Sequence, residues 1–314
     1  MRKRVVVALG GNAILQRGQR GTAAEQMENV RMTAEQVVRM IQAGYEVILT
    51  HGNGPQVGTI LIQNELGARQ VPPMPMDVCG AESQGFIGYL FSQALSNCMR
   101  EKGLHGGMPV CIVTRVRVDG SDPAFKNPTK PVGPFFSEEE AKKRIEQRGE
   151  TWIEDAGRGW RRVVPSPDPK EIVEKYAVAD LVEKGYVVIA SGGGGIPVVD
   201  DGNGKLEGIE AVIDKDLAAE RLAHDVRANV LMILTDVPRV LINYRQPGEK
   251  ALETISSTEL EDYMREGHFK AGSMGPKVEA TLRFVRNGGE RAVIARLDEA
   301  LEALEGSNGT QVFR

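Results

Sequence analysis

The chain has 314 residues, of which 41% are hydrophobic and 26% are charged, and its formal net charge is −4. These values are typical of a soluble globular protein with one large domain or two. The negative charge argues against a nucleic-acid-binding surface, and no run approaches the ~20 apolar residues that a membrane helix needs. Three cysteines without a C-x-x-C pair fit a reducing compartment, so we expect a cytoplasmic protein whose cysteines are small buried residues.

Short apolar runs alternate along the chain with segments in which apolar residues recur at helical spacing. The run 5–9 predicts a strand that ends in a glycine loop at 10–12, and a helix is expected over 27–41. The run 45–50 predicts a second strand, which ends in a glycine loop at 52–54. Further elements are expected later in the chain, as strands in 107–118, 186–195, 229–237 and 290–297 and helices in 213–226 and 274–286. Such repeated β-α units predict an α/β fold with a mainly parallel sheet and helices on both faces.

The stretch from Val118 to about Pro169 interrupts this alternation with about fifty polar residues, dense in charge and proline. Within it, Ser137 and Glu140 have the spacing of a capping box that starts a helix. Long insertions into α/β domains are more often subdomains or active-site lids than structureless loops. We therefore predict an inserted lid over 119–160, with a solvated excursion of no function as the alternative.

Glycine loops follow the first two strands and precede helices, and a third glycine run follows at 192–195. Ligands of parallel sheets bind beyond the carboxyl ends of the strands, where helix N-termini offer backbone amides to anions. The first strand nevertheless has Ala8 and no lysine, and the chain contains no P-loop motif. It also lacks the dinucleotide fingerprint, since the second strand ends in Thr50-His51 and not in an acid, which argues against an oxidoreductase.

Two lysines stand at predicted helix starts and offer the positive charge that the first loop lacks. Lys215 lies between Asp214 and Asp216, which would keep it charged and oriented for a phosphate. Lys277 follows the glycine-rich opening 272–276 of another helix, where amides, helix dipole and side chain would face an anion. The alternatives are a solvated surface cluster at the first site and plain helix punctuation at the second. The four histidines form no metal-spaced cluster, and at His51 a turn-capping role is favoured over that of a general base.

With these residues in view, the chain resembles the carbamate kinases, of the amino-acid-kinase fold, over essentially its whole length. The resemblance rests on nine specific segments: VVALGGNA, THGNGPQVG, PMDVCGAESQGFIGY, DPAFKNPTKPVGPF, GRGWRRVVPSPDP, IASGGGGIPV, EAVIDKDLA, MILTDV and EGHFKAGSMGPKVEA. It implies one domain over 1–314, an open αβα sandwich with a protruding inserted subdomain. It further implies a homodimer and reversible phosphoryl transfer between ADP/ATP and carbamoyl phosphate/carbamate.

The family pattern also implies roles for particular residues. The N-terminal lobe, residues 1–185, would hold the carbamoyl phosphate or carbamate, through Gly10, Gly11, Asn12, Gly52, Asn53, Gly54 and Lys130. The C-terminal lobe, residues 186–314, would hold the nucleotide, through Asp236, Tyr244, Ser273, Met274 and Gly275. Lys215 and Lys277 would stabilise the moving phosphoryl group, and Asp214 and Asp216 would orient the two lysines. Mg²⁺ would be bound mainly by the nucleotide phosphates, with no dedicated protein metal site.

Two alternatives remain open from the sequence. The first is a sibling kinase that phosphorylates an amino acid or a nucleoside monophosphate. Ala8 and the NPTKPVGPF segment argue against this alternative. The second is a catalytically silent protein that senses a small ligand on the same fold. The presence of Lys130, Lys215 and Lys277 argues against that alternative.

Overall fold

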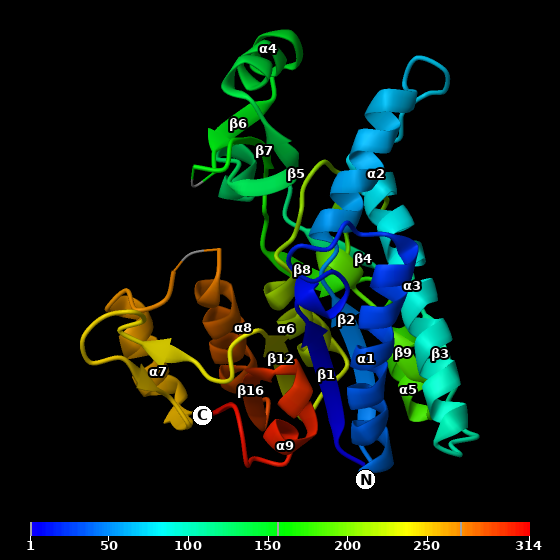
Figure 1. Ribbon diagram of the computed structural model, residues 1–314, viewed down its shortest axis with the longest axis vertical. Coiled ribbons are helices and arrows are strands. Elements are labelled where there is room, and N and C mark those ends of the chain that lie inside the picture. Colours follow the sequence, from blue (N-terminus) through cyan, green and yellow to red (C-terminus); the bar gives the residue numbers. More distant parts are fainter. Residues whose placement is uncertain (1, 156, 271) are drawn as a thin grey trace.

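The computed structural model describes residues 2–155, 157–270 and 272–314. Within these residues an eight-stranded sheet runs through the molecule in the order β15-β17-β16-β12-β1-β2-β9-β3 (Figure 1). All neighbouring strands pair in parallel except β16 and β17, which confirms the predicted mainly parallel sheet. The strands are β15 (Thr254–Ser256), β17 (Thr310–Phe313), β16 (Arg291–Arg296), β12 (Val230–Thr235), β1 (Arg4–Leu9), β2 (Glu46–His51), β9 (Val187–Ile189) and β3 (Pro109–Cys111).

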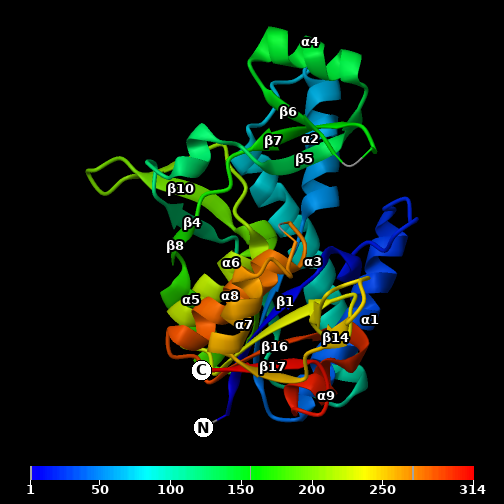
Figure 2. The same ribbon diagram turned by 90° about the vertical axis from the view of Figure 1, so that its left-hand side faces the viewer.

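Helices cover both faces of this sheet because alternate side chains of its buried strands point to opposite faces. Val5, Val7 and Leu9 of β1 pack into one core, which includes α1 (Ala23–Gln42), α3 (Met76–Glu101) and α9 (Ala300–Leu304). Val6 and Ala8 pack into the other core, with α5 (Lys175–Glu183), α6 (Lys215–Asp225), α7 (Ser257–Arg265) and α8 (Met274–Arg286). The molecule is thus the open αβα sandwich that was predicted, as the two perpendicular views show (Figures 1 and 2).

The interruption after β4 (Arg115–Val118) folds into a separate unit that protrudes beside the far end of α2 (Gly54–Gly67), as both views show. The unit consists of the antiparallel strands β5-β7-β6 and one helix: β5 (Lys130–Phe136), α4 (Glu138–Arg148), β6 (Thr151–Glu154) and β7 (Trp160–Val164). Arg144 of α4 pairs with Glu65 of α2 at 3.0 Å. Ser137 accepts from the amide of Glu140 as predicted, but the Glu140 carboxylate pairs with Arg144 at 3.1 Å, so only half of the capping box forms.

The prediction of one strand within 107–118 is wrong, because the chain changes sheets there. β3 ends at Cys111, and β4 (Arg115–Val118) joins a second sheet of order β11-β10-β4-β8. Thr114 is fully buried at the crossing, where its amide donates to Gln84 Oε1 at 2.7 Å and its carbonyl accepts from Gln84 Nε2 at 3.1 Å. Gln84 thus gives the Thr114 amide a partner, while the Thr114 carbonyl also accepts from the amide of Ile196 at 2.9 Å. The other strands of the second sheet are β8 (Pro169–Ile172), β10 (Ile196–Asp200) and β11 (Leu206–Gly208).

The remaining predicted elements are found close to their expected positions. Short elements connect them: β13 (Leu241–Ile242), β14 (Lys250–Ala251), η1 (Gly11–Ala13), η2 (Pro123–Lys126), η3 (Gly192–Gly194) and η4 (Leu297–Glu299).

The three cysteines are free thiols, but only Cys79 and Cys98 are buried. Cys111 is half-buried, contrary to expectation, because β3 is the edge strand of the sheet. Across the residues that the structure describes, no helix combines the length and apolar character needed to cross a membrane.

Helix α3 contacts the edge strand β3 through Gly88, which makes this glycine a test of the packing. A Cβ atom at Gly88 would overlap Cys111, whose Cβ would lie 2.8 Å away. We expect Gly88→Ala to reduce the free energy of unfolding by about 1–3 kcal/mol, the usual cost of overpacking. Gly85 of the same helix is the matched control, because a Cβ there meets nothing within 4 Å. Gly85→Ala should be neutral or stabilising by up to ~1 kcal/mol. Equal unfolding midpoints for both variants in urea would contradict this description of the packing.

Candidate active site

The glycine loops after β1 and β2 lie side by side at the carboxyl edge of the sheet. The amide of Gly10 donates to the carbonyl of Leu234, the last-but-one residue of β12, at 3.1 Å. The amide of Gly52 donates to the Leu9 carbonyl at 3.2 Å, which ties the second loop to the first. A Cβ atom at Gly52 would lie 3.3 Å from Cδ of Lys215, so the loop leaves room for this lysine to pass. The strand order thus brings residues from positions 10, 52 and 215 to one place.

Asp216 is the polar centre of the site. Its side chain lies in the first turn of α6, and the residue is only 3% exposed. Oδ1 accepts from Nζ of Lys215 at 2.6 Å, and Oδ2 accepts from Nζ of Lys277 at 2.9 Å. Lys277 comes from the first turn of α8, so this carboxylate joins the starts of two helices. The arrangement holds two lysines together that would repel each other without it.

The charge state of this triad follows from its surroundings. Burial would raise the pKa of Asp216, but Lys215 and Lys277 outweigh this effect and hold the pKa at about 2. Desolvation lowers the pKa of Lys215, while the neighbouring carboxylate of Asp216 opposes that shift. Asp216 is therefore ionised at neutral pH, and its charge favours the protonated form of Lys215.

The carboxylate of Asp214 bonds the start of α6 and Lys130, and its predicted role in orienting Lys215 and Lys277 stays a prediction. Oδ1 caps α6 by accepting from the amides of Asp216 at 2.9 Å and Leu217 at 3.4 Å. Oδ2 pairs with Nζ of Lys130 at 2.7 Å. Lys130 is the first residue of β5, so this ion pair connects the protruding unit to the start of α6. The helix cap fixes Asp214, and Asp214 in turn fixes Lys130.

A small cavity of about 240 Å³ contains most of the predicted acceptor residues. Its walls include Gly11, Gly52, Asn53, Gly54, Lys130, Asp214, Lys215, Asp216, Ser273 and Lys277. Gly193 of the third glycine run also lines it, although it was not among the individual residues predicted for the site. A Cβ atom at Gly193 would overlap the side-chain amide of Asn53, and φ is +68°, so both space and backbone require glycine there.

A second cavity, of about 570 Å³, opens beside β12 and the start of α8. It contains four of the five predicted nucleotide residues: Asp236, Tyr244, Ser273 and Met274. Gly275 lines neither this cavity nor the small one, and its amide donates to the carbonyl of Lys270 at 3.0 Å. Ser273 and Lys277 belong to both cavities, so the two spaces meet at the start of α8.

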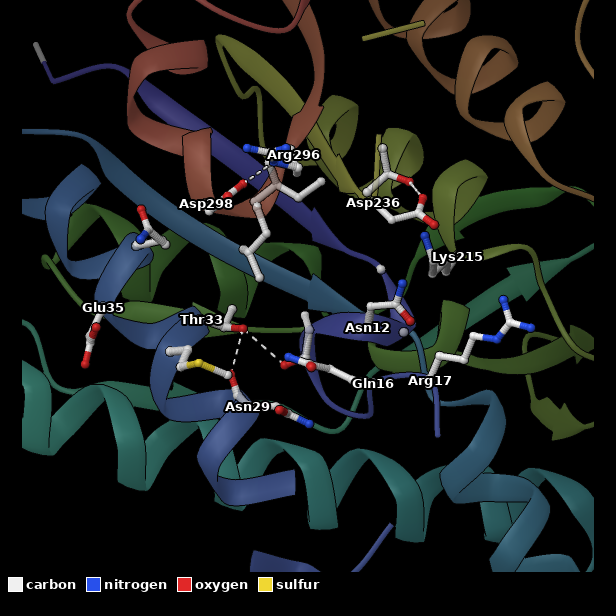
Figure 3. Close-up of a pocket in the computed structure, with 18 of the residues that line it drawn as sticks. Asn12, Gln16, Arg17, Asn29, Thr33, Glu35, Lys215, Asp236, Arg296 and Asp298 are labelled. Carbon is white, nitrogen blue, oxygen red and sulfur yellow. Dashed lines mark hydrogen bonds and ion pairs between the residues drawn. The ribbon is translucent and has the colours of Figure 1, made fainter. Parts of the chain in front are cut away.

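A third and larger cavity, of about 790 Å³, lies between the first glycine loop and α1 (Figure 3). Gly10, Asn12, Lys215, Asp236 and Lys277 line it, which places the two remaining acceptor residues, Gly10 and Asn12, next to the lysines. The rest of its lining includes Gln16, Arg17, Asn29 and Arg296, none of which the sequence had indicated. Arg17 lies in a loop whose apolar residues have no regular spacing. Neither a motif nor hydrophobic periodicity could therefore have identified it.

His51 lies beneath the second glycine loop and is 1% exposed. Its Nδ1 lies 2.9 Å from the carbonyl oxygen of Gly52, which is the arrangement expected for a turn-capping residue. Burial lowers the pKa of His51 to about 4, an effect that the hydrogen bond to Gly52 opposes. A buried imidazole that is this weakly basic is a poor general base at neutral pH.

The chain is similar to known proteins over nearly its whole length. A model of the amino acid kinase family matches residues 3–296. The carbamate kinase of Thermococcus kodakarensis is 62% identical over 99% of both chains, and that of Pyrococcus horikoshii is 58% identical over 99% of both. A solved structure of carbamate kinase from Giardia lamblia bound to AMP-PNP is 47% identical, with a TM-score of 0.94 over 99% of this chain and 98% of that one.

These comparisons cover nearly the full length of the chain and its relatives, so the matching region includes the main sheet and the protruding unit. They confirm the resemblance that the nine sequence segments indicated. The chain belongs to the amino acid kinase family and, within it, to the carbamate kinases.

Proposed function

We propose that this chain catalyses reversible phosphoryl transfer between ADP/ATP and carbamoyl phosphate/carbamate, in the cytoplasm. The observation that carries the proposal is the pair Lys215 and Lys277, held on the buried carboxylate of Asp216 where the small cavity meets the second one. Phosphoryl transfer asks mainly for positioning and for positive charge at the moving group. A lysine pair between two cavities supplies both. The carbamate kinase relatives support the choice of substrates.

The small cavity is the proposed site of the acceptor. Its volume of about 240 Å³ suits a small anion, and Lys130 together with the loop 52–54 would bind the carboxylate and phosphate oxygens. An ionised carbamate oxygen can attack the phosphoryl group directly, so the reaction needs no general base. This agrees with the weak basicity of His51, whose pKa is about 4.

The second cavity is the proposed site of the nucleotide. Tyr244 and Met274 offer apolar surface for a base, while Ser273 and Lys277 at the start of α8 face the junction where phosphates would lie. We assign Gly275 a supporting role, because its close approach to the Lys270 carbonyl shapes this turn. The lining of the acceptor cavity includes residues from both 1–185 and 186–314. We therefore propose that these two ranges are cooperating lobes of one domain, and that 119–160 is the lid.

Mg²⁺ is the proposed metal, and it would arrive with the nucleotide. The described residues include no group of three or more His, Cys, Asp or Glu side chains that could hold a metal. Mg²⁺ commonly binds through phosphate oxygens and waters with only one or two carboxylates. Asp236, which lines both the second and the third cavity, is suitably placed to be such a carboxylate. When bound, the ion would neutralise some of the phosphate charge.

A homodimer and a cytoplasmic location complete the proposal. Large apolar side chains are exposed near the edge strand β3, including Tyr89 of the adjacent helix α3 at 61% and Met108, which directly precedes β3, at 66% exposure. An open strand edge with apolar neighbours is suited to pairing with a second copy. The location is supported by the three cysteines, all of which are free thiols.

The proposed activity is tested by measuring ATP formed from carbamoyl phosphate and ADP in the presence of Mg²⁺. We expect turnover with carbamoyl phosphate and none above background with acetylglutamate, aspartate or UMP in the ATP-consuming direction. Turnover with one of those acceptors alone would favour a sibling kinase. Absence of any turnover, with ADP still bound in a calorimetric titration, would favour a ligand-sensing protein.

The first mutational prediction concerns Lys215. Lys215→Ala should lower kcat by about 10²- to 10³-fold, the scale for losing one preorganised charge in a transition state. Lys205→Ala is the matched control, since this lysine is exposed in the turn between β10 and β11 and should leave kcat unchanged. The thermal midpoint of both variants should stay close to that of the wild type. A kcat for Lys215→Ala equal to that of the control would show that Lys215 takes no part in the phosphoryl transfer step.

The second mutational prediction concerns the lid. Lys130→Ala should raise the KM for carbamoyl phosphate by about tenfold or more, since a charge-assisted contact is worth roughly 1.5–3 kcal/mol. The KM for ADP should change less than about twofold, because Lys130 lines the small cavity and not the second one. Lys126→Ala, an exposed lysine at the end of η2, is the control. An unchanged KM for carbamoyl phosphate would show that β5 does not cover the acceptor.

A further inference from the structure

The loop between η1 and α1, residues 14–22, is anchored from below by buried side-chain amides. Nδ2 of Asn29 donates to the Ile14 carbonyl at 3.0 Å and to Oε1 of Gln19 at 2.6 Å, and Asn29 itself is 2% exposed. Nε2 of Gln26 donates to the carbonyl of Gly21 at 2.8 Å. Both ends of the loop are therefore fixed to α1, although the loop contains no regular structure beyond its turns.

The same anchor reaches the acceptor side of the site. Oε1 of Gln26 accepts from Nε2 of Gln56 at 2.8 Å, and both residues are buried. Gln56 lies in the first turn of α2, directly after the glycine loop 52–54 that lines the small cavity. The position of loop 14–22 is thus set relative to the acceptor loop and not only to α1.

Arg17 lies at the centre of this anchored loop and is exposed. It lines the third cavity together with Asn12 and Lys215, and Figure 3 shows these three side chains on the same side of that cavity. Among the described residues, no carboxylate forms an ion pair with Arg17. Arg296, which lines the opposite side of the cavity, is neutralised by Asp298 at 2.6 Å and Glu299 at 2.9 Å. Arg17 is therefore the arginine of this cavity that can still bind an anion.

The charges of the small cavity show why a further cation matters. Three lysines, at 130, 215 and 277, face two aspartates, at 214 and 216, which leaves a net charge of +1. Carbamoyl phosphate and ADP together carry several negative charges, which Mg²⁺ offsets only partially. A guanidinium presents paired donors that match two phosphate oxygens, and arginine is suited to this geometry where lysine is not.

We propose that Arg17 binds the phosphoryl group during its transfer, from loop 14–22 on the third cavity, whereas Lys215 and Lys277 reach it from two helix starts. The proposal rests on the proposed function of the site. It assigns the third cavity a role in the reaction, as the space from which loop 14–22 presents a cation to the phosphate oxygens. Arg17 would then be a catalytic residue supplied by the β1–α1 connection.

The test compares two nucleotides that differ in the terminal phosphoryl group and the imido bridge that carries it. ADP and AMP-PNP are titrated by calorimetry, with Mg²⁺, into the wild type, Arg17→Ala, Arg17→Lys and Arg20→Ala. Arg20 is the matched control, since it is exposed on the same loop but does not line the third cavity. We expect Arg17→Ala to weaken AMP-PNP by about tenfold and ADP by less than twofold. Arg17→Lys should recover some of the AMP-PNP affinity, and Arg20→Ala should match the wild type.

Activity measured on the same four proteins separates this inference from the proposed function. Arg17→Ala should lower kcat for ATP formation from carbamoyl phosphate by tenfold or more, with Arg20→Ala unchanged. If the wild type is active and binds AMP-PNP but Arg17→Ala matches it in both measurements, the role of Arg17 is refuted. Equal losses for ADP and AMP-PNP would also refute it, since they would place the effect on the nucleotide as a whole. A wild type without activity would refute the proposed function instead.

Discussion

The site depends on one buried carboxylate. Two lysines cannot share a small space without a counter-charge, and a lone carboxylate cannot stay ionised at 3% exposure without cations. Asp216 meets both conditions at once, with one oxygen for Lys215 and the other for Lys277. Because the lysines begin different helices, the same bonds fix α6 and α8 relative to each other where a substrate phosphate would lie. The remaining features of the site are arranged around this fixed charge pattern.

Glycines give that pattern the room it needs. A Cβ atom at Gly52 would lie only 3.3 Å from Cδ of Lys215. In the Gly192–Gly194 turn, Cβ atoms at Gly192 and Gly193 would overlap the side chains of His51 and Asn53. At these glycines the backbone is not covered by side chains. Its amide groups are therefore accessible to a small anion. The weakly basic His51 supports one of these loops from below through its contact with the Gly52 carbonyl.

Local signals made the sheet, the helices and the lysine-bearing helix starts predictable from sequence. Strand and helix periodicity identified β1, β2, α1 and α8, and the D-K-D cluster identified the start of α6. Those local signals do not predict contacts between segments that are distant in the sequence. Nothing in the sequence indicates that Asp214 pairs with Lys130, 84 residues away. Nor does it indicate that 107–118 contains two strands, with Gln84 bonded to the backbone between them. Gly275 matched the family motif, yet its amide is already bonded to Lys270.

The order of strands in the main sheet has a consequence for how the chain reaches its structure. β1 is central, but one of its neighbours, β12, begins at residue 230, and β9 separates β2 from β3 although it follows both in the chain. During synthesis from the N-terminus, β1 and β2 can pair early, while the other edge of β1 stays open until Val230–Thr235 has emerged. Such non-local pairing slows folding and leaves an apolar edge exposed to association with other chains. Within the main sheet, β1, which carries the first glycine loop, thus has the longest interval between its own synthesis and that of its second neighbouring strand.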